Sequence, residues 1–264
     1  MKSYSTFLVF LQLLRRDVYA FGKRLTNYGI NSFFITPFCS IVVFGYLQSS
    51  IYFGEHKIQS GIVLIVGSLT FNMILLCYNF LTPFLYDLET ERFIDFQLLQ
   101  IKPRWLLFEM ILFPALLSIL LSLPFFALAA LLLPGYFAHL NTHWLGLSIM
   151  IIASSLFASS YMMLSLCLID KARNIRRFWL RVNWPLVVLG GLWIPWHLLK
   201  KFSPTLAYID LANPILYITE GIRSALIGSD QFISYQICIF ALLLFFCIFS
   251  VLAGYFFKRK MDHI

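Results

Sequence analysis

The chain has 264 residues, of which 60% are hydrophobic and only 12% are charged, and its formal net charge is +8. Soluble domains carry about 25% charged residues, so half of the charge expected for a water-facing surface is missing. These proportions exclude an ordinary soluble enzyme, a disordered chain and a secreted disulfide scaffold, and they predict a protein that lives in a lipid bilayer.

The first 28 residues predict a helix that lies on the membrane surface. Apolar side chains recur in it at helical spacing, and the basic residues lie off that stripe. A basic amphipathic helix of this kind lies in the cytoplasmic membrane interface with its apolar face down. The apolar stripe consists of Leu11, Leu14, Val18, Phe21 and Leu25.

Six later segments are apolar and long enough to cross the membrane. About 20 apolar residues cross roughly 30 Å of hydrocarbon, and a spanning segment must be helical to satisfy its own backbone polar groups. We therefore predict an all-α membrane protein in which residues 1–264 form a single transmembrane domain with six transmembrane helices. Pro185, the pair Gly190-Gly191 and Pro195 predict kinks in the fifth span. The predicted spans are 29–53, 60–86, 105–134, 144–169, 178–199 and 232–257.

The loop between the second and third spans predicts a short cytoplasmic helix with an apolar face. Ile94, Leu98 and Ile101 share one helical face. The helix should end before Pro103, because proline disfavours the α conformation of the preceding residue. Such a helix either rests on the membrane surface or docks into a partner protein. The same loop holds an acidic cluster, formed by Asp87, Glu89, Glu91 and Asp95.

The segment 202–230, between the fifth and sixth spans, predicts helices that enter the outer leaflet and return. It is apolar, yet it carries three charges that would each cost about 3 kcal/mol near the middle of the bilayer. Asn213 is a favourable N-cap, and Pro214 suits the first helical position after it. The glutamate and the arginine of the segment are three residues apart, so they can neutralise each other on one helix face. The charged residues are Asp210, Glu220 and Arg223.

The distribution of lysine and arginine predicts that both termini are cytoplasmic. Sixteen of the 20 lie in the N-terminal segment, in the loops after the second and fourth spans, or in the C-terminal tail, and four lie on the opposite side. Cytoplasmic loops of membrane proteins carry the excess of basic residues. The net positive charge is therefore a topology signal, and it does not indicate binding to nucleic acid.

Two other function classes stay open on the residues alone. A membrane-embedded prenyltransferase would use the acidic cluster to hold Mg²⁺ and a diphosphate, although the other large cytoplasmic loop is basic and supplies no second cluster. A secondary carrier would bury a charged residue within a span for ion coupling, and we expect the predicted spans to lack one.

No nucleotide, metal or other cofactor site is predicted in this chain. The pair Gly22-Lys23 lacks the upstream glycine and the following Ser or Thr of a phosphate-binding loop. The five cysteines all fall within predicted spans, without the paired spacing of a metal or redox motif. If ATP drives this protein, another chain must bind it.

Three groups of residues, taken in chain order, form motifs. The first is Leu14-Arg15-Arg16-Asp17, the second is Glu91-Arg92 with Leu98-Leu99, and the third is Asn213-Pro214 with Tyr217, Glu220 and Arg223. In their order and in their relation to six spans, they resemble the N-terminal elbow, the coupling segment and the re-entrant signature of type-2 integral-membrane permeases of ABC exporters. One departure is Phe93-Ile94-Asp95, where many members have a small Gly-Thr-like stretch.

The resemblance implies a transport subunit that is not itself an enzyme. Such a permease forms a dimer, expected here to be a homodimer, and binds two copies of a separate ABC ATPase that carries the ATP and Mg²⁺. It implies an exporter of the bacterial inner (cytoplasmic) membrane, with an amphipathic, lipid-linked or polysaccharide-type substrate. The residues implied to couple to the ATPase are Glu89, Glu91, Arg92, Asp95, Leu98 and Leu99, and those implied to form the re-entrant segment are Asn213, Pro214, Tyr217, Glu220 and Arg223.

Overall fold

The computed structural model describes residues 11–12, 14–19, 22, 30–48, 57–89, 103–137, 140, 142–169 and 171–262. Within these ranges every regular element is a helix and no strand occurs, so the all-α class is confirmed. The elements are, in chain order, η2 (Asn31–Ile35), α2 (Thr36–Ser40), η3 (Ile41–Gln48), α4 (Lys57–Glu89), α6 (Pro103–Leu132), α7 (Pro134–Phe137), α8 (Trp144–Cys167), η5 (Ala172–Asn174), α9 (Ile175–Phe178), η6 (Trp179–Asn183), α10 (Trp184–Val187), η7 (Val188–Leu192), α11 (Trp196–Phe202), α12 (Pro204–Asp210), α13 (Pro214–Ile227) and α14 (Tyr235–Asp262).

Four stretches of the described helices are each long and apolar enough to cross a membrane by themselves. A fifth crossing is present if the bent pair Ala172–Leu192 and Trp196–Phe202 counts as one span. A shorter apolar helix, Asn31–Leu47, occupies the first predicted span. The chain is therefore a multi-pass helical membrane protein, and the sixth crossing stays a prediction. The four stretches that are long and apolar enough by themselves are Gly61–Tyr86, Arg104–Leu132, Trp144–Cys167 and Tyr235–Lys260.

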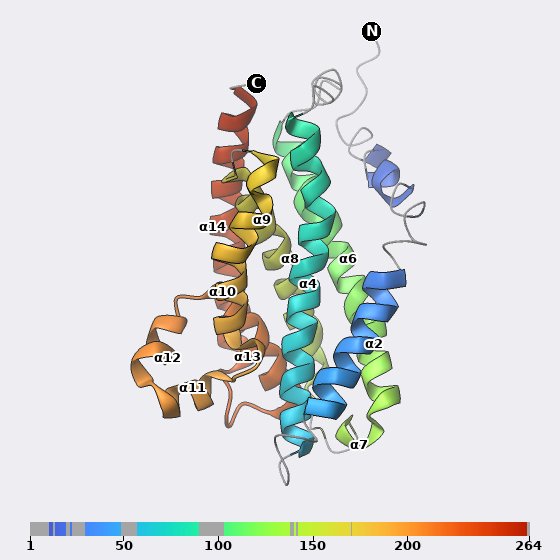
Figure 1. The fold of residues 1–264 in the computed structure, drawn as a ribbon, viewed down its shortest axis with the longest axis vertical. Coiled ribbons are helices and arrows are strands. Elements are labelled where there is room, and N and C mark those ends of the chain that lie inside the picture. The colour runs from blue at the N-terminus through green and yellow to red at the C-terminus, as the bar shows by residue number, and fades with distance from the viewer. Residues whose placement is uncertain are drawn as a thin grey trace.

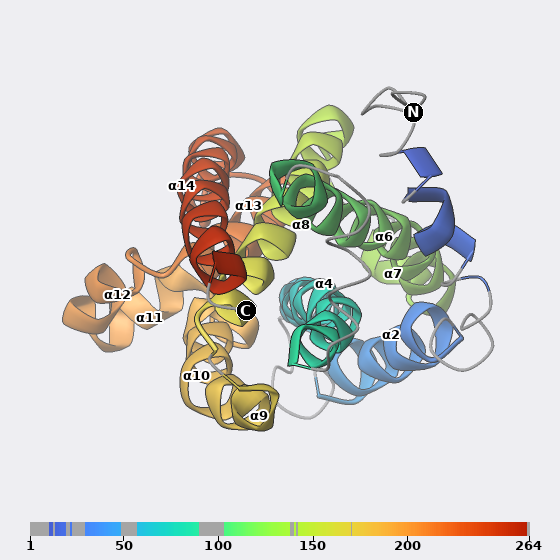
Figure 2. The same ribbon diagram turned by 90° about the horizontal axis from the view of Figure 1, so that it is seen from above.

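The core of the bundle lies around α8. Helices α4, α6 and α14 pack against α8, and α13 packs against both α8 and α14 (Figures 1 and 2). The buried ring of Phe157 on α8 meets the rings of Tyr161 and Phe249. In the most apolar stretch of α4, 83% of the residues are buried, whereas in that of α14 only 17% are buried. Helix α4 is thus internal, and α14 presents most of its apolar surface outward, as a lipid-facing helix does.

The basic segments gather at one end of the bundle. The C-terminal end of α14, the start of α9, the end of α4 and the start of α6 lie there, whereas α7, α11 and α12 lie toward the other end (Figure 1). Lys260, near the end of α14, donates hydrogen bonds to the carbonyl of Leu166, in the last turn of α8, and to that of Ile169, just after it. Consecutive long helices therefore alternate in direction, as successive membrane crossings require.

The fifth helical run, from Ala172 to Leu192, ends in a break. Gly190 has φ −64° and ψ 29°, and Gly191 has φ 80°, a left-handed conformation that glycine adopts without steric cost. The next helix, α11, is turned by 93° relative to the run before it. The predicted kink is therefore present, but the predicted span continues to residue 199, whereas the structure places residues 196–199 in α11, after the turn.

The described part of the N-terminal segment is helical at residues 14–19. Leu14 packs against a small core cluster, while Val18 is 55% exposed. One residue of the predicted stripe therefore contacts the bundle and another faces outward. Phe21 and Leu25 lie outside the described residues. The cluster consists of Phe33, Leu76, Phe113, Leu117 and Leu121.

Helix α6 carries a buried carboxyl group. Glu109 is 1% exposed, and the charged side chains of Asp17 and Arg16 lie near it. The expectation that the predicted spans lack a buried charged residue is therefore wrong, because the buried Glu109 lies within the third predicted span, just before an uncharged run. The predicted spans therefore no longer argue against a secondary carrier, which would bury a charged residue of this kind.

Candidate functional site

The predicted re-entrant segment folds as α12 and α13, and α13 begins as its sequence predicts. The Asn213 side chain accepts a hydrogen bond from the backbone N–H of Ile215 (3.2 Å), and Pro214 occupies the first turn. The helix stops at Gly228, whose φ is 125°. Asn213 also donates through Nδ2 to the carbonyl of Leu186 (2.8 Å), so the N-cap ties the start of α13 to α10.

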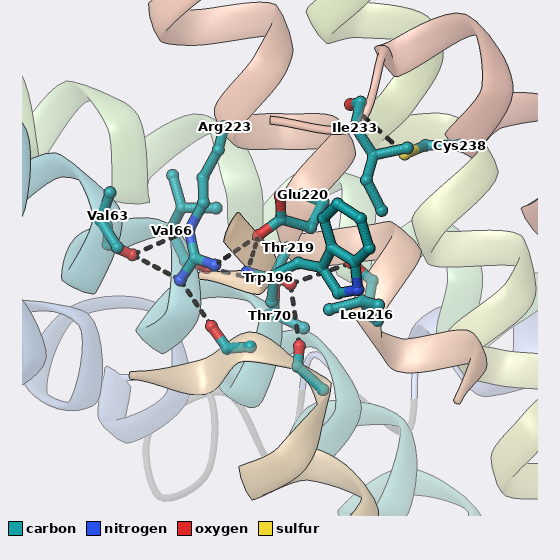
Figure 3. A network of polar contacts seen from close by, with 12 residues as sticks. Val63, Val66, Thr70, Trp196, Leu216, Thr219, Glu220, Arg223, Ile233 and Cys238 are labelled. Atoms are coloured by element: carbon teal, nitrogen blue, oxygen red, sulfur yellow. Dashed lines mark hydrogen bonds and ion pairs between the residues drawn. The ribbon is translucent and has the colours of Figure 1, made fainter. Parts of the chain in front are cut away.

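Glu220 and Arg223 form a fully buried ion pair on α13 (Figure 3). Both side chains are 0% exposed, and Nη1 of Arg223 lies 3.3 Å from Oε1 of Glu220. Exposed ion pairs are worth about 0–1 kcal/mol. Removing one partner of a buried pair costs about 3–5 kcal/mol, because the other charge is left uncompensated. Removing either side chain alone should therefore strongly lower the stability of the folded protein.

Arg223 also reaches two other helical segments. Its Nε and Nη2 atoms donate to the carbonyl of Val63 on α4 (3.2 and 2.9 Å), and Nη2 donates to the carbonyl of Gly191 (2.5 Å) (Figure 3). The planar fork of five donors allows a guanidinium to serve several acceptors at once. Arg223 thus joins α13 both to α4 and to the break that follows the fifth helical run.

Glu220 holds the helix on the far side of the break. Its Oε1 atom accepts a hydrogen bond from the backbone N–H of Trp196 (3.1 Å), the first residue of α11. The first N–H groups of a helix have no partner within the helix, and a carboxylate is favoured there by the helix dipole. The Glu220 side chain therefore both neutralises Arg223 and fixes the start of α11. We call Val63, Gly191, Trp196, Glu220 and Arg223 the clamp.

Two glycines allow the clamped segments to approach each other. A Cβ atom at Gly67 of α4 would lie 1.8 Å from the carbonyl oxygen of Leu192. A Cβ atom at Gly191 would lie 2.6 Å from Oγ1 of Thr219, which donates a hydrogen bond to the carbonyl of Gly190 (2.8 Å). The break fits against α4 and α13 only because these two positions have no side chain.

Tyr217 and Asp210 support the turn between α12 and α13. The hydroxyl of Tyr217 donates to the carbonyl of Leu211 (2.7 Å), and Oδ1 of the buried Asp210 accepts from Nδ2 of Asn213 (3.1 Å). Burial raises the pKa of Asp210 to about 6, and the negative charge of Glu220 adds to this shift while Asn213 opposes it. The folded state holds this proton more tightly than the unfolded state does. Stability contributed by Asp210 therefore falls as the pH rises from about 4 to 6.

The predicted ATPase-coupling residues lie largely outside the described residues. This holds for Glu91, Arg92, Asp95, Leu98 and Leu99. For Glu89 only the backbone is described, at the end of α4. The structure therefore brings the five residues of the predicted re-entrant segment together at one end of the bundle and leaves the coupling set as a prediction.

Four residues in or beside the clamp were not predicted from the sequence. Val63 contributes a backbone carbonyl, for which the residue type carries no signal. Gly67 does have a signal, since an isolated glycine within a helical pattern often marks close packing of another segment. Trp196 and Thr219 contribute a backbone N–H and a hydroxyl whose targets depend on the break. The sequence predicted the pairing of Glu220 with Arg223, but it did not predict the backbone groups of other segments that the two side chains bind.

The clamp joins α13 to three other helical segments through one ion pair and hydrogen bonds to backbone groups. The guanidinium of Arg223 and Oε1 of Glu220 bind each other and backbone groups of neighbouring segments, whereas Oε2 of Glu220 is buried without a hydrogen-bond partner. Within the described parts of the chain, no group of three or more His, Cys, Asp and Glu side chains could hold a metal ion. The clamp fixes the bent pair Ala172–Leu192 and Trp196–Phe202 at one end of an apolar bundle.

The chain is similar to one protein family across most of its length. The family model described as ABC-2 type transporter matches residues 10–227, a range that includes the bundle from α2 through α13 and all the clamp residues. No curated protein and no solved structure gives a significant match. The chain belongs to the ABC-2 type transporter family, and it is a transport membrane subunit of the kind that works with a partner ABC ATPase.

Proposed function

We propose that this chain is the permease subunit of an ABC exporter in the bacterial inner membrane. Two copies of the chain assemble with two copies of a separate ATPase, which binds ATP and Mg²⁺ and hydrolyses the nucleotide. Both termini and the coupling residues face the cytoplasm. The observation that carries the proposal is the family match over residues 10–227, which covers the bundle through α13 and the buried clamp.

The proposed substrate is amphipathic, lipid-linked or polysaccharide-type. This class rests on the resemblance to exporter permeases. The proposed movement begins when the ATPase pair closes and pushes the helix between α4 and α6, and it ends when the opposite end of the bundle opens for release.

Helix α4 provides a direct mechanical connection for this movement. It runs from Lys57 to Glu89, so its last residue borders the coupling loop while Val63 lies in the clamp. At 1.5 Å per residue, the helix carries a displacement over about 40 Å between these two points. Because α4 is internal and contacts α6 and α8, a push at its cytoplasmic end is transmitted to the break rather than lost in lipid.

Negative charge on the apolar face of the coupling loop should separate the permease from its ATPase. The variant Leu98→Asp with Leu99→Asp is expected to lose co-purification with a Walker-motif ATPase and to abolish ATP hydrolysis by the complex, while still inserting in the membrane. A charge in an apolar docking face costs several kcal/mol unless it is paired. Both quantities are measured on the complex purified in detergent and reconstituted in vesicles.

The matched control for this test lies in the same loop. Gln97→Asp with Gln100→Asp adds the same charge at the two polar positions that flank the leucines in the predicted helix, and it should leave ATPase binding and hydrolysis near wild type. Normal coupling in the leucine variant, or an equal loss in both variants, would show that the loop is an ordinary solvated connection.

The proposed orientation predicts which positions react with an impermeant thiol reagent. In a cysteine-free background, a cysteine at Gly135, exposed on α7, should be labelled in intact cells. A cysteine at Arg173, exposed at the opposite end of the bundle, should be labelled only after permeabilisation. The reverse pattern would place the termini outside and contradict the charge distribution on which the orientation rests.

A further inference from the structure

The hairpin formed by α11 and α12, residues 196–210, has its polar and apolar sides reversed relative to a hairpin in water. Phe202, Leu206 and Ile209 are 84%, 52% and 64% exposed, whereas Ala207 and Asp210 are buried. The hairpin projects sideways from the bundle, away from the long helices (Figures 1 and 2). A projecting element with an apolar outer surface requires an amphiphilic surrounding rather than bulk water.

Cations and aromatic rings lie together on this hairpin. Lys200 and Lys201 are exposed in the last turn of α11. The ammonium of Lys200 lies 5.0 Å from the ring centroid of Trp196 and 5.6 Å from that of Tyr208. The Trp196 indole N–H donates to the carbonyl of Ala207 (2.8 Å), which locks α11 against α12. The ammonium is thus held in place by two rings and can still donate hydrogen bonds to an anion.

No exposed acidic side chain offsets these two cations on the hairpin. Asp210 is the single acidic residue between residues 196 and 212, and it is 6% exposed and bonded to Asn213. The outer surface therefore combines apolar side chains, interfacial aromatic residues and net positive charge. This combination binds the boundary between acyl chains and anionic headgroups.

We propose that the α11–α12 hairpin lies along the membrane interface as a lipid anchor, with Phe202, Leu206 and Ile209 among the acyl chains and with Lys200 and Lys201 bound to the phosphate of an anionic phospholipid. A symmetric contact between two copies of the hairpin would bring like charges together, so a lipid is the better occupant. The anchor holds α11 from the lipid side, while Glu220 holds its first residue from the bundle side.

The test measures contact between the full-length protein and a phospholipid. The protein is reconstituted in phosphatidylcholine vesicles that contain phosphatidylglycerol with a photoreactive group near its headgroup, and the adducts are mapped by mass spectrometry. Wild-type protein should carry adducts on residues 196–210. The variant Lys200→Gln with Lys201→Gln should lose these adducts by about tenfold, because each lysine near the surface contributes to anionic-lipid attraction.

Two further variants control for charge and for folding. Lys258→Gln with Arg259→Gln removes the same charge from exposed positions at the other end of the bundle, and it should leave adducts on the hairpin unchanged. Lys200→Arg with Lys201→Arg should retain them. Thermal midpoints and ATPase co-purification, measured on the same variants, should equal those of the wild type, so a failure of the lipid contact is separable from a failure of the proposed transport function.

Three results would overturn the lipid anchor. The first is equal labelling of the hairpin in the wild type and in the glutamine variant. The second is equal labelling by photoreactive phosphatidylcholine, which would remove the role of the anionic phosphate. The third is a cross-link between the hairpins of two copies, which would assign this surface to a second protomer.

Discussion

Replacing Arg223 with alanine should lower the free energy of unfolding of the detergent-solubilised protein by about 3–5 kcal/mol. The substitution leaves the buried carboxylate of Glu220 without its counter-charge and removes the donors to the carbonyls of Val63 and Gly191. The break should then detach from α4 and α13. Thermal unfolding, followed by fluorescence in a fixed detergent, measures the effect together with the yield of monodisperse protein.

A double-mutant cycle separates the pair from its surroundings. Glu220→Ala should cost less than Arg223→Ala, because Arg223 keeps its carbonyl acceptors. The double variant should cost less than Arg223→Ala alone, since no unpaired charge remains. Arg223→Lys should be intermediate, because an ammonium keeps the charge but not the fork. Arg177→Ala, at an exposed position on α9, is the control and should change stability by less than about 0.5 kcal/mol. Additive effects of the two alanine variants would show that the charges act separately.

Much of the fold follows from local sequence signals. The uncharged runs predict the long helices α4, α6, α8 and α14, because a bilayer leaves few other ways to satisfy the backbone. The start of α13 at Asn213-Pro214 and its end at Gly228 follow from capping preferences that act within one turn. Gly190-Gly191 predicted a kink, although the size of the turn depends on what holds α11 beyond it.

The rest depends on contacts between segments that are distant in the chain. The bond from Arg223 to Val63 joins residues 160 positions apart, and its acceptor is a backbone carbonyl that any residue would supply. The burial of the Glu109 carboxyl group has no local signal, because an apolar run begins only at the next residue. The reversed polarity of α12 is likewise hidden in the sequence, since Leu206 and Asp210 reveal their sides only once the hairpin is placed against the bundle.

The clamp and the hairpin are joined through Trp196, which belongs to both. Glu220 caps α11 at Trp196, and the ring of Trp196 in turn lies beside Lys200 on the outer surface. In the proposed transport cycle, a movement of α4 that shifts the Val63 carbonyl would act on Arg223, on the break and on the hairpin in sequence. In the proposed transport cycle, opening the end of the bundle that carries α11 and α12 requires this unit to move as a body or to lose several buried hydrogen bonds at once.

Replacing Gly67 with alanine should destabilise the protein, although alanine is the better helix former by about 1 kcal/mol. The added Cβ atom would lie 1.8 Å from the carbonyl oxygen of Leu192, which is backbone and cannot rotate away. Either α4 or the break must shift, and overpacking of a buried site costs about 1–3 kcal/mol or more.

The expected result is a lower thermal midpoint and weaker ATPase-dependent transport for Gly67→Ala, since the contact between α4 and the clamp is the proposed route of the movement. Gly135→Ala is the matched control, because no atom lies within 4 Å of a Cβ atom built at that helical position. There the helix preference of alanine acts alone, so stability should stay equal or rise. A higher midpoint for Gly67→Ala would mean that the close approach of Leu192 to α4 is not part of the folded protein. The clamp would then lack the support that brings the Val63 carbonyl within reach of Arg223.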